Sequence, residues 1–169
     1  VGWDKEIPST MPAESITIKA LWTINQYTIT FDTDGGSEIA PITQDFNSTV
    51  TAPANPTKTG YTFVGWDKEI PNTMPAESIT IKALWTVNTY KLTYKVDGEV
   101  YKEYDVEYGA TITPEEAPEK EGHTFSGWSD IPDTMPANSL VLEGTFTINQ
   151  YPITFDTDGG TEIAPITQD

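Results

Sequence analysis

Internal repetition is the feature that most constrains how this chain can fold. Residues Val1–Gln26 match Val64–Thr89 at 23 of 26 positions, and Tyr27–Asp45 match Tyr151–Asp169 at 17 of 19. Self-similarity of this kind indicates an array of small units, so it has to be recognised before chain length is used to count domains. The sequence therefore predicts several small cores and argues against one large one.

A diverged copy, Tyr90–Gln150, lies between the near-identical segments. It keeps the same landmarks in the same order: Gly65-Trp66 returns as Gly127-Trp128, and Thr73–Ala76 returns as Thr134–Ala137. We divide the chain into four segments. Residues 1–26 are the C-terminal part of one repeat, 27–89 a complete repeat, 90–150 a complete diverged repeat, and 151–169 the N-terminal part of another.

The pattern within a repeat is that of β-strands. Large apolar and polar residues alternate with period two in Tyr27–Phe31, and β-branched and aromatic residues are frequent. Further strands are expected at Tyr61–Trp66 and Ser78–Trp85. Asp34-Gly35-Gly36 supplies residues that tolerate the positive φ angles of a tight turn. The diverged copy predicts a hairpin in which Tyr90–Val96 turns at Asp97-Gly98 and returns over Glu99–Val106.

One short helix is expected. In Thr113–Glu116 a capping Thr precedes Pro and two acidic residues, and Pro118 limits the helix to about one turn. The predicted fold is mainly β and β-strand-based in every unit, of the α+β kind with at most a short helix per unit. The units follow one another without a Gly/Ser-rich linker, so we expect a fairly stiff chain of separate units, like beads on a string. The cores are expected to depend on large side chains: Phe31, Tyr61, Phe63, Trp66, Met74 and Trp85.

The charge and the cysteine count exclude several classes of partner. Acidic residues number 26 against 9 basic ones, which gives a net charge of −17. Such a chain repels phosphate backbones and anionic membrane surfaces, so we expect no nucleic acid as partner. There is no Cys for a disulfide framework or a Cys-based zinc site, and no apolar run long enough to insert in a membrane.

Several acidic residues and the single His are candidate site residues. Asp32 and Asp34, repeated as Asp156 and Asp158, could bind Ca²⁺, but Asp before Gly is also what a turn requires. The carboxylates of Asp67-Lys68-Glu69 and Glu115–Glu121 could act as an acid–base pair, but a solvated acidic surface is the better interpretation. His123, the single His, occupies an aromatic position of the repeat and is expected to be packed.

Tryptophans that follow Gly at equal places, Trp3, Trp66 and Trp128, are the candidate binding residues. Exposed in a row, they could stack on sugar rings. The alternative, which we prefer, is that each is the central core residue of its repeat. We predict no catalytic, metal or cofactor-binding residues and no cofactor.

The recurring motifs resemble a known family. The pattern Y-x-I-T-F-D-x-D-G-G, P-x-K-x-G-Y-T-F-x-G-W and M-P-A-x-x-I-T-I-x-A-x-W is similar to the Listeria–Bacteroides repeat, the family of internalin-type B repeats. The resemblance implies a β-grasp-like fold and tandem arrays in exported bacterial proteins, with no catalytic residues. The diverged copy departs from the pattern, with His123 in place of Tyr61 and Phe146 in place of Trp85.

These observations lead to two functional hypotheses. The first is a structural segment, a stalk, spacer or filament-forming unit of a bacterial cell-surface or secreted protein, whose partners are neighbouring repeats of the same chain or filament. The second is an adhesive binding module for a host glycan or protein. Both place the segment outside the cell, and neither is an enzyme. The incomplete end segments, Val1–Gln26 and Tyr151–Asp169, could be completed by continuation of the chain or head to tail by another chain.

Overall fold

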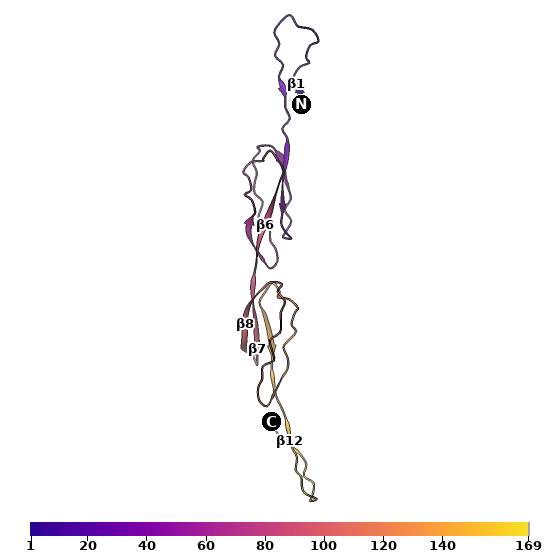
Figure 1. The fold of residues 1–169 in the computed structure, drawn as a ribbon, viewed down its shortest axis with the longest axis vertical. Coiled ribbons are helices and arrows are strands. Elements are labelled where there is room, and N and C mark those ends of the chain that lie inside the picture. Colours follow the sequence, from indigo (N-terminus) through magenta and orange to yellow (C-terminus); the bar gives the residue numbers. More distant parts are fainter. Residues whose placement is uncertain (169) are drawn as a thin grey trace. The chain divides into compact units, whose positions relative to one another are not determined.

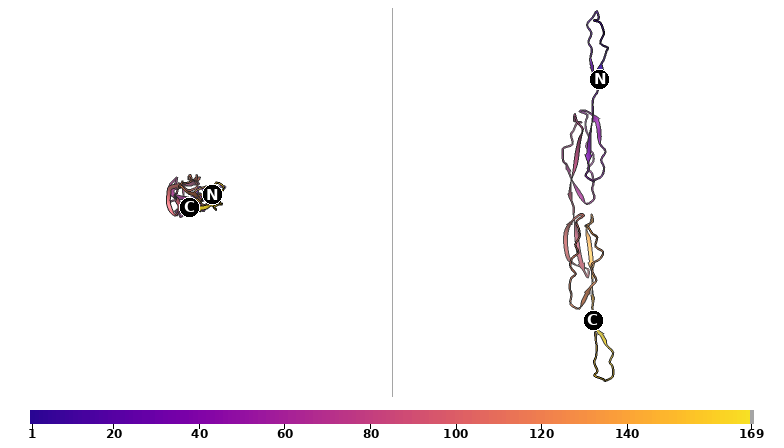
Figure 2. Two further views of the ribbon diagram at one scale, coloured as in Figure 1. Left: turned by 90° about the horizontal axis from the view of Figure 1, so that it is seen from below. Right: turned by 45° about the vertical axis from the view of Figure 1, so that its right-hand side comes forward.

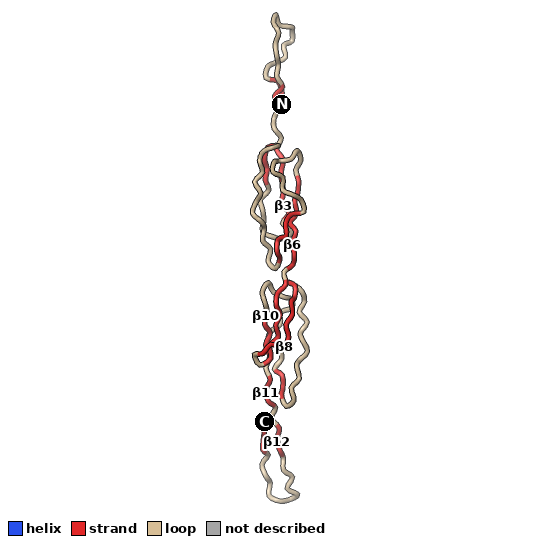
Figure 3. Tube along the Cα trace, turned by 90° about the vertical axis from the view of Figure 1, so that its left-hand side faces the viewer, coloured by secondary structure: helices blue, strands red, loops and turns tan. Residues whose placement is uncertain are grey.

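The computed structural model describes residues 1–168, and these residues form strands and loops with no helix (Figure 3). They divide into two compact units, each described here by itself. The first unit contains Val1–Lys58 and Phe63–Trp85. The second contains Thr59–Thr62 and the described chain from Thr86 onward.

The first unit is built on a four-stranded mixed sheet in the order β4-β3-β6-β5. Its central strand β3 pairs antiparallel with β4, Ile29 opposite Ile42, and parallel with β6, Ile29 opposite Ile79. The first and last strands of the repeat are therefore central neighbours, which is the β-grasp-like arrangement implied by the family resemblance (Figures 1 and 3). The strand bounds are β3 Gln26–Asp32, β4 Ile42–Asp45, β5 Tyr61–Trp66 and β6 Ile79–Val87.

Alternation along these strands creates the core of the first unit. Ile29 and Phe31 on β3 and Ile81 on β6 are buried, while Thr30 and Lys82 between or beside them are exposed. The buried cluster is completed from loops: Ile29, Phe31, Val50, Met74 and Ile81. Because successive side chains of a strand point to opposite faces, one face of the sheet is apolar. The predicted strand at Tyr27–Phe31 and the predicted core positions Phe31 and Met74 are confirmed.

The second unit repeats this arrangement with a three-stranded sheet in the order β10-β7-β8. Its strands are β7 Thr89–Val96, β8 Glu99–Glu107 and β10 Leu140–Gly144. The predicted hairpin is confirmed: β7 pairs antiparallel with β8 around Asp97 and Gly98, whose φ angles are 52° and 88°. Strand β10 pairs parallel with β7, Leu142 opposite Tyr94.

The core of the second unit contains equivalent residues. It is formed by Leu92, Tyr94, Ile112, Met135 and Leu142. Met135 has 1% of its surface exposed, the same fraction as Met74 in the first unit. Each complete repeat therefore buries its own Met from the Thr-Met-Pro-Ala motif. A separate pair of strands, β9 His123–Phe125 and β11 Phe146–Ile148, lies antiparallel in this unit.

The predicted helix at Thr113–Glu116 is wrong. These residues form a loop without a helical turn, and this loop follows an isolated bridge at Thr111. The carbonyl oxygen of Glu115 accepts a hydrogen bond from Trp128 Nε1 at 2.9 Å. The Glu115 carboxylate pairs with Lys102. These tertiary contacts replace the local hydrogen bonds that the helix-start motif would have favoured.

The segments at the ends of the chain are two-stranded hairpins (Figure 2). Strands β1 Gly2–Trp3 and β2 Ala20–Leu21 pair antiparallel in the first unit. Strands β12 Tyr151–Ile153 and β13 Ile166–Gln168 do so in the second. Their apolar side chains are largely exposed: the equivalent of buried Met74 is Met11, which is 90% exposed.

Candidate functional site

Trp66, on β5, belongs to the aromatic packing of the first unit. It is half-buried and contacts Phe31 and Phe63, with ring centroids 5.3 and 5.2 Å away. Phe31 is itself a core residue, so Trp66 covers the edge of the core. Offset and edge-on pairs of this kind contribute about 0.5–1.5 kcal/mol beyond their buried area.

Trp128 is the equivalent residue of the second unit, and it is packed more completely into aromatic neighbours. It is half-buried, with Tyr94 and Phe125 in edge-to-face contact at 4.8 and 4.9 Å. Its indole N–H donates to the carbonyl oxygen of Glu115. The ring of Tyr101, an exposed residue, lies 6.0 Å from the Trp128 ring and is tilted by 31°.

Trp3 differs from both. It lies on the short strand β1, and 55% of its surface is exposed. The structure thus places Trp3, Trp66 and Trp128 in three different surroundings, one open and two packed against a core. A sugar-stacking role for these three residues stays a prediction.

A second tryptophan of the repeat, Trp85, was expected only as a core residue, but it also holds the acidic turn. Its Nε1 donates to the carbonyl oxygen of Thr33 at 3.0 Å, and Phe63 packs on its ring at 5.4 Å. The ring lies so close to Gly36 that a side chain there would collide with it, 2.6 Å from the nearest ring carbon. The Gly-Gly pair of the motif is therefore needed for close approach as well as for turning.

The candidate calcium turn carries its own cations. Asp34 adopts a φ of 50°, and its N–H donates to Asp32 Oδ1 at 3.0 Å. The Asp34 carboxylate lies 2.9 Å from Lys82 Nζ and 3.6 Å from Lys58 Nζ. The hydrogen bond and charge of Lys82 lower the pKa of Asp34, and Asp34 raises the pKa of Lys82. This geometry favours the interpretation as a turn neutralised by lysine.

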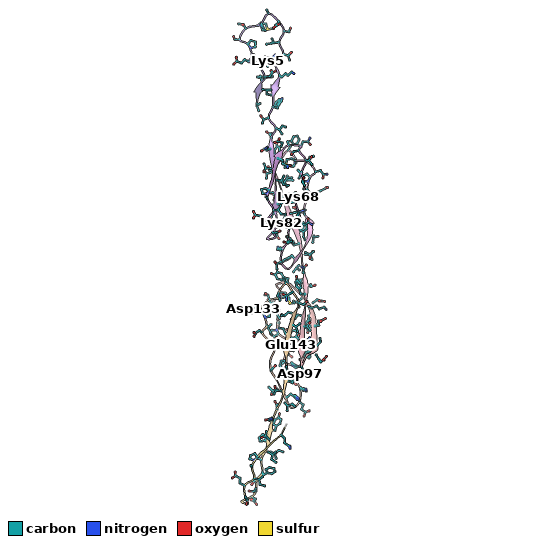
Figure 4. The ribbon with its side chains drawn as sticks, turned by 180° about the vertical axis from the view of Figure 1, so that it is seen from behind. Lys5, Lys68, Lys82, Asp97, Asp133 and Glu143 are labelled. Atoms are coloured by element: carbon teal, nitrogen blue, oxygen red, sulfur yellow. The ribbon has the colours of Figure 1, made fainter. Side chains whose placement is uncertain are left out.

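Asp67, one of the candidate acid–base residues, joins the two strands that flank it. Its N–H donates to the carbonyl oxygen of Lys82 at 2.8 Å, and its carboxylate accepts from the Lys82 N–H at 2.6 Å. Lys68 Nζ donates to the carbonyl oxygen of Thr80 at 3.1 Å; Figure 4 labels Lys68 and Lys82 on this stretch. Asp4 makes the same contact with Lys19 in the N-terminal hairpin, at 2.8 Å. These carboxylates bind backbone, which is a structural role.

Glu115 is at the centre of a polar cluster of the second unit. Its carboxylate accepts from Lys102 Nζ and from the Tyr104 hydroxyl, the latter at 2.6 Å. The hydrogen bond from Lys102 is the largest cause that lowers the pKa of Glu115, and Glu115 raises the pKa of Tyr104. Charge-assisted hydrogen bonds of this kind fix side chains in place. The cluster attaches the loop after Thr111 to strand β8.

An open hollow of about 410 Å³ lies beside His123 in the second unit. Its walls include Glu121, His123, Phe125 and Phe146. His123 is half-buried, with its ring 6.1 Å from Phe146 and its Nδ1 2.8 Å from the carbonyl oxygen of Glu121. The ring is thus packed on one side, as its aromatic position suggested. The hollow could not be predicted from the sequence, because its walls come from strands β9 and β11 and from the loop that precedes β9.

Residues 1–168 contain no group of three or more His, Asp or Glu side chains placed to hold a metal ion. Within the same residues, no helix is long and apolar enough to cross a bilayer.

The fold and these sites define a mainly β chain of tandem repeats, in which each of the two complete repeats has its own apolar core. The model of the Listeria–Bacteroides repeat domain matches residues 27–83 and 90–139. The chain belongs to this family, as its motifs predicted.

Two relatives align with this chain over a minor part of their own length. A putative membrane protein of Evansella cellulosilytica is 31% identical over 186 aligned residues, with 99% of this chain and 28% of that protein covered. Internalin H of Listeria monocytogenes is 36% identical over 145 aligned residues, with 75% of this chain and 26% of that protein covered. The chain thus spans about a quarter of each relative. A solved structure of SHIRT domains 3–4 from a streptococcal cell surface protein aligns over 73% of this chain at 19% identity, with a TM-score of 0.26.

Proposed function

We propose that this chain is a structural spacer segment of an exported bacterial protein and that it projects other parts of that protein from the cell surface. The observation that carries the proposal is duplication of the core. Met74 and Met135, at equivalent positions, are both buried, and each belongs to a separate apolar cluster. A repeat that completes its own core can be added to or removed from an array without loss of the others.

The connection between repeats supports the same function. Strand β6 ends at Val87 and β7 begins at Thr89, so one residue, Asn88, separates them. A linker this short has little freedom compared with a Gly/Ser-rich one. The acidic surface, with a net charge of −17, favours solubility of a long exposed array.

The polar clusters support a role outside catalysis. Carboxylates from each group of acidic candidates are engaged in structural contacts: the calcium candidate Asp34 with Lys82, and the acid–base candidates Glu115 with Lys102 and Asp67 with backbone. A general acid or base has to be available to a substrate at the correct protonation state. We therefore propose a non-enzymatic segment, located outside the cell.

Small-angle scattering tests the spacer. We would compare the full chain with chains lengthened by one and two further copies of Tyr27–Thr89. A spacer predicts that the maximum dimension increases by a similar amount with each added copy. A maximum dimension that grows only with the cube root of mass would contradict it, because that is the behaviour of one collapsed body.

A second candidate function is adhesive binding, and one surface of the second unit favours it. Tyr101 and Tyr104 on β8 are each 41% exposed, and Tyr101 lies over Trp128. Exposed aromatic rings with a polar tip are suited to stack on sugar rings and to contact proteins. A glycan array with the full chain and with Tyr101→Ala tests it, with Val100→Ala on the same strand as the matched control. Binding that is absent, or equal in the two variants, would remove this candidate.

A further inference from the structure

A contact inside the second unit shows how an aromatic side chain is received by a glycine turn. Tyr108 packs on the Gly60-Tyr61 turn, edge to face with Tyr61 at 5.8 Å and 81°. Gly60 is buried there with a φ of 77°, and a methyl group at Gly60 would overlap the Tyr108 ring. The segment Thr59–Thr62 belongs to this unit, so the contact is internal to it.

Two backbone hydrogen bonds hold this arrangement. The Asn88 N–H donates to the carbonyl oxygen of Gly60 at 2.9 Å, and the Tyr108 N–H donates to the carbonyl oxygen of Asn88, also at 2.9 Å. Thr62 Oγ1 donates to the Asn88 side chain at 2.5 Å. The asparagine thus connects the glycine turn to the residue that carries the aromatic ring.

The glycine half of this arrangement returns one repeat later. Gly122 has a φ of 71°, its carbonyl oxygen accepts from the Asn149 N–H at 2.8 Å, and Thr124 Oγ1 donates to the Asn149 side chain at 2.5 Å. His123 stands where Tyr61 stands. Here, however, Gly122 is exposed, and a methyl group at Gly122 would meet no atom within 4 Å. His123, the next residue, lines the open hollow of about 410 Å³.

The aromatic half returns as well. Phe46 comes directly after β4, as Tyr108 comes directly after β8. Each precedes a residue with positive φ, Asn47 at 65° and Gly109 at 76°. The Phe46 N–H donates to the carbonyl oxygen of Asn25, as that of Tyr108 does to Asn88. Phe46 packs edge-on against Tyr27 at 6.5 Å and remains 49% exposed. Every complete repeat therefore presents an aromatic side chain on the same turn.

We propose that the exposed turn Gly122–His123 is a docking socket for the turn aromatic of another repeat. The occupant is the Phe or Tyr that follows the second strand of a repeat, positioned by a backbone N–H that donates to the carbonyl oxygen of Asn149. The hairpin Tyr151–Gln168 is close in sequence to the one that presents Phe46, so a repeat completed from this hairpin, as in the lengthened chain below, would supply such an aromatic. The socket serves either function proposed above, since it concerns how repeats are joined.

The first test compares Gly60, on which Tyr108 packs, with its exposed equivalent Gly122. Gly60→Ala and Gly122→Ala impose the same positive-φ strain in the full chain, but only the first collides with an aromatic ring. We expect amide exchange at Asn88 to accelerate in Gly60→Ala more than exchange at Asn149 does in Gly122→Ala. Tyr108→Ala, added to Gly60→Ala, should remove most of that excess. Equal effects of the two glycine substitutions would overturn the model of the socket.

A lengthened chain then tests the open socket. The full chain is extended at its carboxyl end by a copy of residues 46–89, with the copy of Phe46 kept as Phe, changed to Tyr, or changed to Ala as matched control. With Phe or Tyr, we expect the His123 ring resonances to move upfield and exchange at Asn149 to slow by roughly two- to tenfold relative to Ala, the range of an aromatic pair. Unchanged His123 resonances and equal exchange in the three chains would overturn the proposal. The methyl resonance of the appended copy of Met74 reports that the added repeat is folded in each.

Discussion

The three methionines of the chain provide a direct test of separate cores. Each belongs to a copy of the Thr-Met-Pro-Ala motif, and they differ in burial: Met74 and Met135 are 1% exposed, whereas Met11 is 90% exposed. Substitution of each by Ala therefore makes one chemical change in three environments. The expected order of destabilisation by the three substitutions follows from the burial of each Met alone.

The expected loss of unfolding free energy is large for a unit of this size. Truncation of a buried Met to Ala costs about 2–5 kcal/mol through lost burial and the cavity left behind. A domain of roughly 60 residues is stable by only about 3–9 kcal/mol in total. Met74→Ala should therefore lower the melting temperature of the first unit by on the order of 10–30 °C. Met135→Ala should do the same in the second unit, and Met11→Ala should change the free energy of unfolding by less than about 0.5 kcal/mol.

Methyl NMR of ¹³C-labelled methionine is the assay, because each copy of the motif gives one resonance. On heating Met74→Ala, the Met135 methyl should keep its native position until the wild-type transition of the second unit. The reciprocal result is expected for Met135→Ala. If Met74→Ala moves the Met135 methyl to its unfolded position at the same low temperature, the two repeats share one interior and the reasoning is refuted.

Three further outcomes are expected. Tyr94 is 1% exposed, and its hydroxyl has no hydrogen-bond partner among the described residues. Tyr94→Phe should therefore leave the free energy of unfolding in urea unchanged or raise it by about 1 kcal/mol. A clear fall in that free energy would show that the hydroxyl is bonded. The Lys102 hydrogen bond lowers the pKa of Glu115 below its ordinary 4.5, so the stability that the ionised carboxylate contributes is present above about pH 4.5 and is lost as pH falls through the lowered pKa. Glu115→Gln should flatten the pH dependence of the free energy of unfolding in that acid range. Parallel pH curves for the two proteins would contradict this prediction. Because Asp34 is paired with Lys82, millimolar Ca²⁺ should leave the melting temperature of the first unit unchanged in calorimetry, and a rise would restore the calcium interpretation.

The sequence was most informative where local pattern and burial agree. The alternation at Tyr27–Phe31 and the Asp97-Gly98 turn predicted the strand β3 and the hairpin of β7 and β8. These features depend on side-chain period and backbone preference, which are local. The family resemblance added the topology, namely that the first and last strands of a repeat pair in parallel, which local pattern alone does not specify.

The failures have tertiary causes. Thr113–Glu116 has the residues of a helix start, but Trp128 and Lys102 bind the backbone and the side chain of Glu115 in an extended loop. The expected aromatic core was only partly correct, because Phe31 is buried whereas Trp66 is half-buried at its edge. The socket at Gly122 and His123 could not be predicted, since it is visible only when the contacts of Gly60 are compared with those of its equivalent.

The parallel pairing of β3 with β6 determines how a repeat responds to tension. When the chain is pulled from both sides, the first strand of the repeat is drawn one way and the last strand the other. Four residue pairs, Ile29–Ile79 through Asp32–Lys82, join these strands, and their hydrogen bonds lie across the pulling direction. All of them bear load together in shear, and the strands cannot unzip one bond at a time. We therefore expect a repeat built this way to yield only at high force, with the paired strands β3 and β6 resisting extension together.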